Sequence, residues 1–288
     1  MSYPERRLAK VALLMAKKQY WNSEAKNARW IKDGRGQGSG KDYKPWFTVR
    51  DVPSEGRSHR IFGHITHRTH HLLSDLELAT FLLLQWNNST TDIREQFPLD
   101  ISVTKLLCDA AGVKHPEHGG VPQFMSSDFL VNTNNPKNRI FAIQVKTSSA
   151  LEDSRTIEKL EIERRYWLEK EIPWYLVTEN EIPKDVFKNL DWLYSLQAQD
   201  FTLEDESRFL DFFATQLERN ASLTIIDLCK QLDSAYHLEL GESLYQIRAL
   251  LARRYFHFDI SIPYTKLRCG DLLLESLDMV VEIKHVSG

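Results

Sequence analysis

The chain has 288 residues, of which 42% are hydrophobic and 27% charged, with a net charge of −3, as expected for a soluble globular protein of one large or two ordinary domains. Its apolar runs fall well short of the roughly 20 residues of a membrane span, and residues 11–16 are too short for a signal-peptide core, so we expect a cytoplasmic protein without a membrane partner. Three scattered cysteines (Cys108, Cys229 and Cys269) argue against a disulfide scaffold and predict free thiols.

The N-terminal part of the chain is basic. Residues 5 to about 26 predict an amphipathic helix, used either for packing or as an arm for DNA or a partner. The glycine-rich residues 34–41 resemble a phosphate-binding loop, but Arg35 stands where a Walker motif has glycine, and Asp42 replaces its Ser or Thr. We therefore expect a flexible turn or a loop that contacts the DNA backbone.

Charge is divided unevenly along the chain. Residues 1–72 contain 15 Lys and Arg against 6 Asp and Glu, a net +9, and the remainder contains 22 against 34, a net −12. A basic segment favours contact with DNA phosphates, and we expect such contacts from Arg57, His59, Arg60 and Arg68. Five histidines between residues 50 and 71 suggest zinc, but their spacing fits no known zinc motif and no cysteine is near; phosphate contact or loop polarity explains them better.

The next predicted elements are strands near residues 46–49 and 59–64, followed by a helix capped by Ser74. Glu77 completes a capping box with Ser74, and Asp75 supplies negative charge at the helix N-terminus. This capping role alone would explain why an acidic residue stands at position 77, without any role in catalysis. Residues 94–99 predict an edge element of a sheet.

Two strand-like segments, residues 125–131 and 141–146, have polar residues where buried strands are apolar; the turn-rich residues 132–138 join them. Asp128 interrupts the first, and Gln144 and Lys146 share one face of the second because side chains alternate along a strand. The arrangement could be a plain cross-strand ion pair on a solvated face. Together with Glu77 on a preceding helix, it is similar to the PD-(D/E)xK core of restriction endonucleases, with Gln144 where that family more often has Asp or Glu.

These residue types suit phosphodiester hydrolysis with two Mg²⁺ ions, for which Mn²⁺ is a plausible substitute. Asp128 could bridge the two ions, with Glu77 completing one ligand shell and the Gln144 side-chain oxygen or the Val145 carbonyl the other. Lys146 could orient or help deprotonate the attacking water.

A charged helix over residues 156–170 and a buried strand over residues 174–178 complete the expected α/β nuclease core. Polar residues and Pro183 follow, so we expect a catalytic domain of residues 1–182 and a second domain of residues 183–288. The second domain is predicted as a mostly α winged helix, used mainly for protein contacts because it is acidic apart from Arg248, Arg253 and Arg254. Its predicted helices span residues 184–195, 203–218, 223–232 and 242–253, and its predicted wing strands residues 255–260 and 271–275.

From about Ile31 onward the chain resembles the TnsA family, the endonuclease subunit of heteromeric bacterial transposases. The matching stretches include residues 31–38, 41–46, 70–79, 92–98, 125–131, 142–146 and 158–167. The resemblance implies catalytic roles for Glu77, Asp128 and Lys146, with Gln144 in the accompanying position. It also implies a Mg²⁺-dependent cut of the non-transferred strand at the 5′ ends of a transposon.

The implied partners are transposon-end DNA, a TnsB-like transposase that cuts and joins the 3′ ends, and a TnsC-like regulatory ATPase, on which residues 279–285 are expected to dock. Two alternatives stay open. One is a restriction or repair nuclease of the same fold, and the other is a non-catalytic adaptor that binds DNA and partners.

Overall fold

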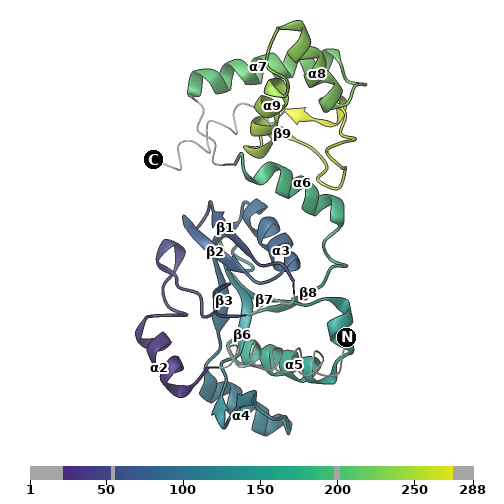
Figure 1. Cartoon of the computed structure of the whole chain (residues 1–288). Coiled ribbons are helices and arrows are strands. Elements are labelled where there is room, and N and C mark those ends of the chain that lie inside the picture. Colours follow the sequence, from purple (N-terminus) through teal and green to yellow (C-terminus); the bar gives the residue numbers. More distant parts are fainter. Residues whose placement is uncertain (1–21, 53–55, 198–201, 275–288) are drawn as a thin grey trace, which may run out of the picture. The chain divides into compact units, whose positions relative to one another are not determined.

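The computed structural model describes residues 22–52, 56–197 and 202–274. The chain forms two compact units, Met1–Ile182 and Pro183–Gly288, which are described separately (Figure 1). Within the described ranges, no helix is both long and apolar enough to cross a membrane. Cys108, Cys229 and Cys269 are buried free thiols, as predicted.

A four-stranded mixed sheet forms the centre of the first unit, in the order β3-β6-β7-β8. Its strands are β3 (Thr90–Pro98), β6 (Ser126–Thr133), β7 (Ile140–Val145) and β8 (Trp174–Val177). The pairs β3–β6 and β6–β7 are antiparallel, and β8 joins β7 in parallel. The two polar-interrupted segments are thus neighbouring strands and β3 is an edge strand, which confirms these predictions.

Helices cover both faces of this sheet (Figure 1). On one side, α4 (Ile101–Ala111) and α5 (Ser154–Glu169) enclose a core that includes Leu130, Ile162 and Trp167. On the other lies α3 (Asp75–Trp86), most of whose side chains are buried. The predicted helices after Ser74 and over residues 156–170 are confirmed. The sequence did not predict α4, although Asp100 caps its start and Gly112, in a left-handed conformation, ends it.

Two predictions in the N-terminal part are wrong. Helix α2 is Glu24–Lys32 and begins after the N-cap Ser23, so the predicted helix does not end at residue 26, and residues 5–21 of that prediction lie outside the described residues. Residues 46–49 form bends and turns instead of a strand. Trp46 is buried because its ring packs against Trp30 and Phe124, so its apolar character reflects packing rather than strand pairing.

A two-stranded hairpin of β1 (His59–Gly63) and β2 (Arg68–Leu72) precedes α3. The sequence predicted the first strand but missed the second. The glycine-rich loop is packed against the central sheet, because a Cβ on Gly36 would lie 2.2 Å from Cγ of Pro98 at the end of β3. Close packing at Gly36 makes this part of the loop fixed structure instead of a flexible turn.

The second unit is mainly helical. Its helices are α6 (Lys184–Tyr194), α7 (Leu203–Arg219), α8 (Ile225–Ala235) and α9 (Glu242–Ala252), and β9 (Phe256–His257) pairs antiparallel with β10 (Leu273–Leu274). The helices lie within three residues of the predicted bounds, but β9 covers only two residues of the strand predicted over residues 255–260, and residues 271–272 of the other predicted strand lie outside β10. The winged-helix assignment itself stays a prediction. Among its clustered arginines, Arg248 donates to the Trp192 carbonyl and Arg253 pairs with Glu206.

Candidate active site

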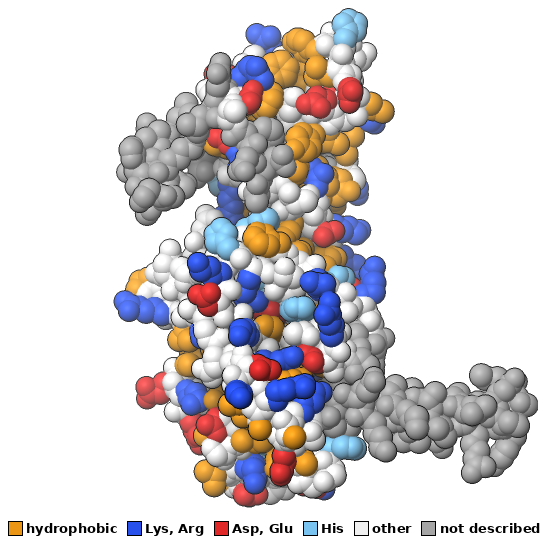
Figure 2. Space-filling view, turned by 60° about the vertical axis from the view of Figure 1, so that its left-hand side comes forward, with side chains coloured by type: hydrophobic (Ala, Val, Ile, Leu, Met, Phe, Trp, Pro, Cys, Tyr) orange, Lys and Arg blue, Asp and Glu red, His pale blue; other side chains and the backbone are white. Residues whose placement is uncertain are grey.

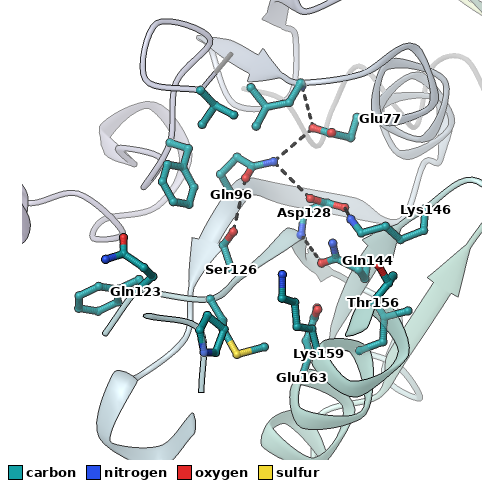
Figure 3. A pocket seen from close by; sticks show the side chains of 17 residues that line it. Glu77, Gln96, Gln123, Ser126, Asp128, Gln144, Lys146, Thr156, Lys159 and Glu163 are labelled. Carbon is teal, nitrogen blue, oxygen red and sulfur yellow. Dashed lines mark hydrogen bonds and ion pairs between the residues drawn. The ribbon is translucent and has the colours of Figure 1, made fainter. Parts of the chain in front are cut away.

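A pocket of about 330 Å³ opens where α3, β3, β6, β7 and α5 meet (Figure 3). Its lining includes Glu77, Asp128, Gln144 and Lys146, so the structure brings the four predicted catalytic residues together. Glu77 is on α3, Asp128 on β6, Gln144 on β7, and Lys146 directly after β7.

Hydrogen bonds from the next strand fix the carboxylate of Asp128. Its Oδ2 accepts from the backbone N–H of Val145 at 2.8 Å and lies 3.7 Å from Nζ of Lys146. The carboxylate is almost fully buried, whereas the lysine side chain keeps 33% of its surface exposed. The pair therefore lies inside a pocket and is not a cross-strand pair on a solvated face.

Of the two residues expected to supply neutral metal ligands, Gln144 lines the pocket, whereas Val145 does not line it and has its carbonyl beside Lys146, which does. Gln144 Oε1 accepts from the backbone N–H of Asp128 at 3.2 Å, and the Val145 carbonyl accepts from Nζ of Lys146 at 2.9 Å. These contacts leave a lone pair on each oxygen, because a carbonyl can accept two hydrogen bonds.

Glu77 both caps α3 and faces the pocket. Its backbone N–H donates to Ser74 Oγ, while its carboxylate accepts from Ser74 Oγ at 3.1 Å and from the Leu73 N–H at 2.8 Å. Burial, followed by the charge of Asp128, raises the pKa of Glu77 to about 8. Its capping role accordingly does not exclude a role in the site.

Helix α5 contributes a second set of pocket residues that the sequence did not predict. Thr156, Lys159, Leu160 and Glu163 line the pocket at helical spacing, a periodicity that could have singled out this face. Burial raises the pKa of Glu163 to about 8, although its carboxylate accepts from Ser127 Oγ at 2.6 Å and Trp174 Nε1 at 2.9 Å. Burial also lowers the pKa of Lys159.

Gln96 on β3 is a further pocket residue that the sequence did not predict. Its side-chain amide donates to the carboxylates of both Glu77 and Asp128 (Figure 3). The available signal in the sequence was a polar residue within the predicted edge element. The sequence could not show that the side chain of Gln96 is buried or that it points into the pocket.

The four residues predicted to contact DNA have different surroundings. Arg57 and His59 both pair with Asp75, at 3.1 and 2.7 Å, and Arg60 is exposed on β1. Arg68 instead points inward, where its guanidinium binds the carboxylate of Glu95 at 2.5 Å. A buried guanidinium that is already paired cannot reach a phosphate, so Arg68 is withdrawn from the predicted DNA contacts.

The pocket's donor set suits a hard divalent cation. Within the described residues, no three His, Cys, Asp or Glu side chains are grouped closely enough to hold a metal, and His70 is engaged with Glu95 and Thr66. The pocket instead offers the carboxyl groups of Glu77, Asp128 and Glu163 and the side-chain amide oxygen of Gln144, the ligand types that Mg²⁺ prefers. Burial, followed by the charge of Asp128, raises the pKa of Glu77, and a divalent cation beside it would favour the ionised form.

Comparison with known proteins gives consistent matches over both units. Residues 87–179 match the family described as TnsA-like endonuclease N terminal, and residues 181–260 match the family described as TnsA endonuclease C terminal. The chain is 49% identical over 274 residues to the Escherichia coli protein named Transposon Tn7 transposition protein TnsA. This alignment covers 95% of the chain and all of that relative.

Proposed function

The chain belongs to the TnsA family of transposition endonucleases, and from this premise we propose that it hydrolyses the non-transferred strand at the 5′ ends of a transposon in a Mg²⁺-dependent reaction. The observation that carries the proposal is the meeting of Glu77 and Asp128 in one pocket with Lys146 beside them. An acid on a helix, with an acid and a lysine on neighbouring strands, are the groups that a PD-(D/E)xK nuclease uses.

Glu77 and Asp128 would hold the cations, with Gln144 Oε1 from the same pocket and the Val145 carbonyl beside Lys146 as neutral ligands. Two Mg²⁺ ions, or Mn²⁺ in their place, would supply stabilisation of the charge on the attacking and leaving oxygens. The hydrogen bond from the Val145 N–H keeps one oxygen of Asp128 directed along β7, which leaves the other oxygen turned toward Glu77 and Gln96.

Lys146 would act on the attacking water and on the scissile phosphate. Its ammonium lies 2.9 Å from the Val145 carbonyl and 3.7 Å from Asp128, so two contacts position it at the pocket. From there it can donate to a phosphate oxygen or hold the water in place.

Transposon-end DNA is the proposed substrate, which places the protein in the cytoplasm, with Arg57, His59 and Arg60 as proposed phosphate contacts. The relative's name assigns it to Tn7 transposition, so we propose a TnsB-like transposase and a TnsC-like ATPase as partners of this chain. The expected docking of residues 279–285 on the ATPase concerns residues outside the described part of the chain.

The test is strand-resolved cleavage of end-labelled transposon DNA in Mg²⁺, with the partner transposase and ATPase present. Asp128→Ala and Lys146→Ala are expected to lose the 5′-end cut while 3′-end cutting and partner binding persist. For Lys146→Ala we expect a loss of at least about 100-fold, which is typical for removal of a group that positions or transfers a proton.

Lys137→Ala is the matched control, because Lys137 is an exposed lysine in the loop between β6 and β7 and lies outside the pocket. It is expected to cut like the wild type. Unchanged 5′-end cutting in Asp128→Ala would assign the chemistry to another chain and leave this one as an adaptor.

A further inference from the structure

The side chain of Gln96 occupies the space between the two acids of the pocket (Figure 3). Its Nε2 lies 3.2 Å from Oε2 of Glu77 and 3.3 Å from Oδ1 of Asp128. One amide group thus contacts both residues that are proposed to hold the cation. Gln96 is 3% exposed, so water does not compete for these contacts.

The orientation of this amide follows from its partners. The NH₂ group faces Glu77 and Asp128 and donates to Oε2 of the first and Oδ1 of the second. A carboxylate oxygen and the carbonyl oxygen of a protonated carboxyl group can both accept such a bond. The amide oxygen then faces Ser126, whose hydroxyl donates to it at 3.5 Å. The NH₂ group brings partial positive charge to a place where two acids repel each other.

The backbone at Gln96 is unusual for a strand. Its φ is 49°, in the left-handed region, although its neighbours Glu95 and Phe97 pair regularly with Phe129 and Ser127 of β6. This conformation is uncommon for residues other than glycine and persists where surrounding contacts hold it. Here the Gln96 carbonyl accepts from the Trp46 N–H at 3.2 Å, which fixes the strand at the point where the side chain enters the pocket.

We infer that Gln96 is a positioning residue of the cation site, and that its amide serves the site in two ways. Before a cation binds, the NH₂ group holds Glu77 and Asp128 together. When a cation binds, the amide turns over about its last side-chain torsion, and Oε1 faces the ion in place of the NH₂ group. The two ends of an amide have nearly the same shape and opposite polarity, so one side chain can satisfy both states. This inference rests on the proposed metal dependence.

The test is Mn²⁺ binding to the full-length protein, measured by electron paramagnetic resonance of the free ion at pH 8.5. Gln96→Met removes both amide atoms at similar volume, and we expect its Mn²⁺ Kd to rise by about 10- to 100-fold, as for other groups that orient metal ligands. Gln123→Met is the matched control. Gln123 lines the same pocket, but its amide binds Asn22 and Val121 backbone carbonyls, so its replacement should leave the Kd unchanged.

A second variant tests the two-state role without relying on Gln96→Met. Gln96→Glu keeps oxygens but has no NH₂ group, so without cations three carboxylates face one another and we expect Tm to fall below that of the wild type. Saturating Mn²⁺ should then raise Tm by more than it does in the wild type, because tighter binding to the folded state gives a larger stabilisation at the same Mn²⁺ concentration.

Asp128→Asn separates failure of this inference from failure of the proposed function. If Mn²⁺ binds the wild type and Asp128→Asn equally, the proposed cation site is wrong and the role of Gln96 with it. If Asp128→Asn loses binding while Gln96→Met keeps the wild-type Kd, the site stands and the positioning role is overturned. A Mn²⁺-induced rise of Tm in Gln96→Glu no greater than in the wild type would also overturn it.

Discussion

Two buried glutamates of the pocket, Glu77 and Glu163, each have a pKa of about 8, and burial is the main cause in both. Burial penalises the ionised form of each, and the charge of Asp128 adds to the effect. They differ in their position. Glu77 faces Asp128 through the amide of Gln96, whereas Glu163 lies on α5 and accepts from Ser127 and Trp174. Without a cation, both side chains therefore hold a proton near neutral pH.

Glu163→Gln should change how stability depends on pH. The folded-state pKa of Glu163, about 8, lies above the ordinary 4.5, so the unfolded chain releases this proton first as pH rises. The contribution of Glu163 to the free energy of unfolding of the wild type is therefore lost between pH 4.5 and 8, by no more than about 1.4 kcal/mol per pH unit. The variant lacks this loss. Urea unfolding in EDTA between pH 5 and 8 should show the wild type losing stability relative to the variant, and parallel curves would contradict the assignment.

At the scale of elements, the start of α3 also shapes the pocket. Ser74 and Glu77 exchange two hydrogen bonds, one that caps the helix and one that orients the carboxylate. The second unit repeats the exchange at α8, where Thr224 Oγ1 accepts from the Asp227 N–H and donates to its carboxylate. The cap of α3 lies beside the candidate active site, because Glu77 lines the pocket.

Ser74→Ala should therefore affect both stability and cation binding. Loss of an N-cap costs about 1 kcal/mol of the free energy of unfolding. Because Glu77 also loses an orienting donor, we expect weaker Mn²⁺ binding. Thr224→Ala should have a similar cost in stability but leave the Mn²⁺ Kd unchanged. Equal Kd values for wild type and Ser74→Ala would show that the cap and the site are independent.

The glycine-rich loop offers a test of packing between elements. Gly36 and Gly40 both have positive φ values, 76° and 51°, but only Gly36 has Pro98 within contact of an added Cβ. Gly36→Ala should cost about 2–4 kcal/mol, because it combines backbone strain with overpacking. Gly40→Ala should cost only about 1 kcal/mol from strain. Denaturant unfolding distinguishes the two, and equal costs would exclude the packing of this loop on β3.

At the scale of the whole molecule, charge differs between the two units. Residues 1–182 contain 26 Lys and Arg against 23 Asp and Glu, whereas residues 183–288 contain 11 against 17. Lys and Arg side chains also gather on the face of the first unit turned forward in Figure 2. DNA affinity is thus expected from the first unit.

Arg60→Ala should weaken DNA binding and reduce its salt dependence. Arg60 is exposed on β1, and each phosphate contact that is lost lowers the slope of log K against log salt by about 0.9. Lys230→Ala in the second unit is the control, because Lys230 is exposed beside Asp227 on the acidic unit. Binding to a transposon-end duplex at several salt concentrations gives both slopes. An unchanged slope for Arg60→Ala would remove this residue from the DNA contacts.

The strands β6 and β7 and the cap of α3 could be predicted from local rules, since side chains alternate along strands and caps follow from residues three apart. The likeness to a nuclease core then singled out Glu77, Asp128 and Lys146. The missed helix α4 carried the same kind of local signal, in Asp100 and Gly112.

The directions in which side chains turn toward remote partners could not be predicted from the sequence and depend on the folded chain. Gln96 meets Glu77 and Asp128 across separations of 19 and 32 residues, and Arg68 turns inward to Glu95 across 27. Trp46 is buried by ring packing and not by strand pairing. Sequence patterns show that a residue is polar or apolar, but the partner that offsets its burial is set by sheet pairing and helix packing, which bring distant parts of the chain together.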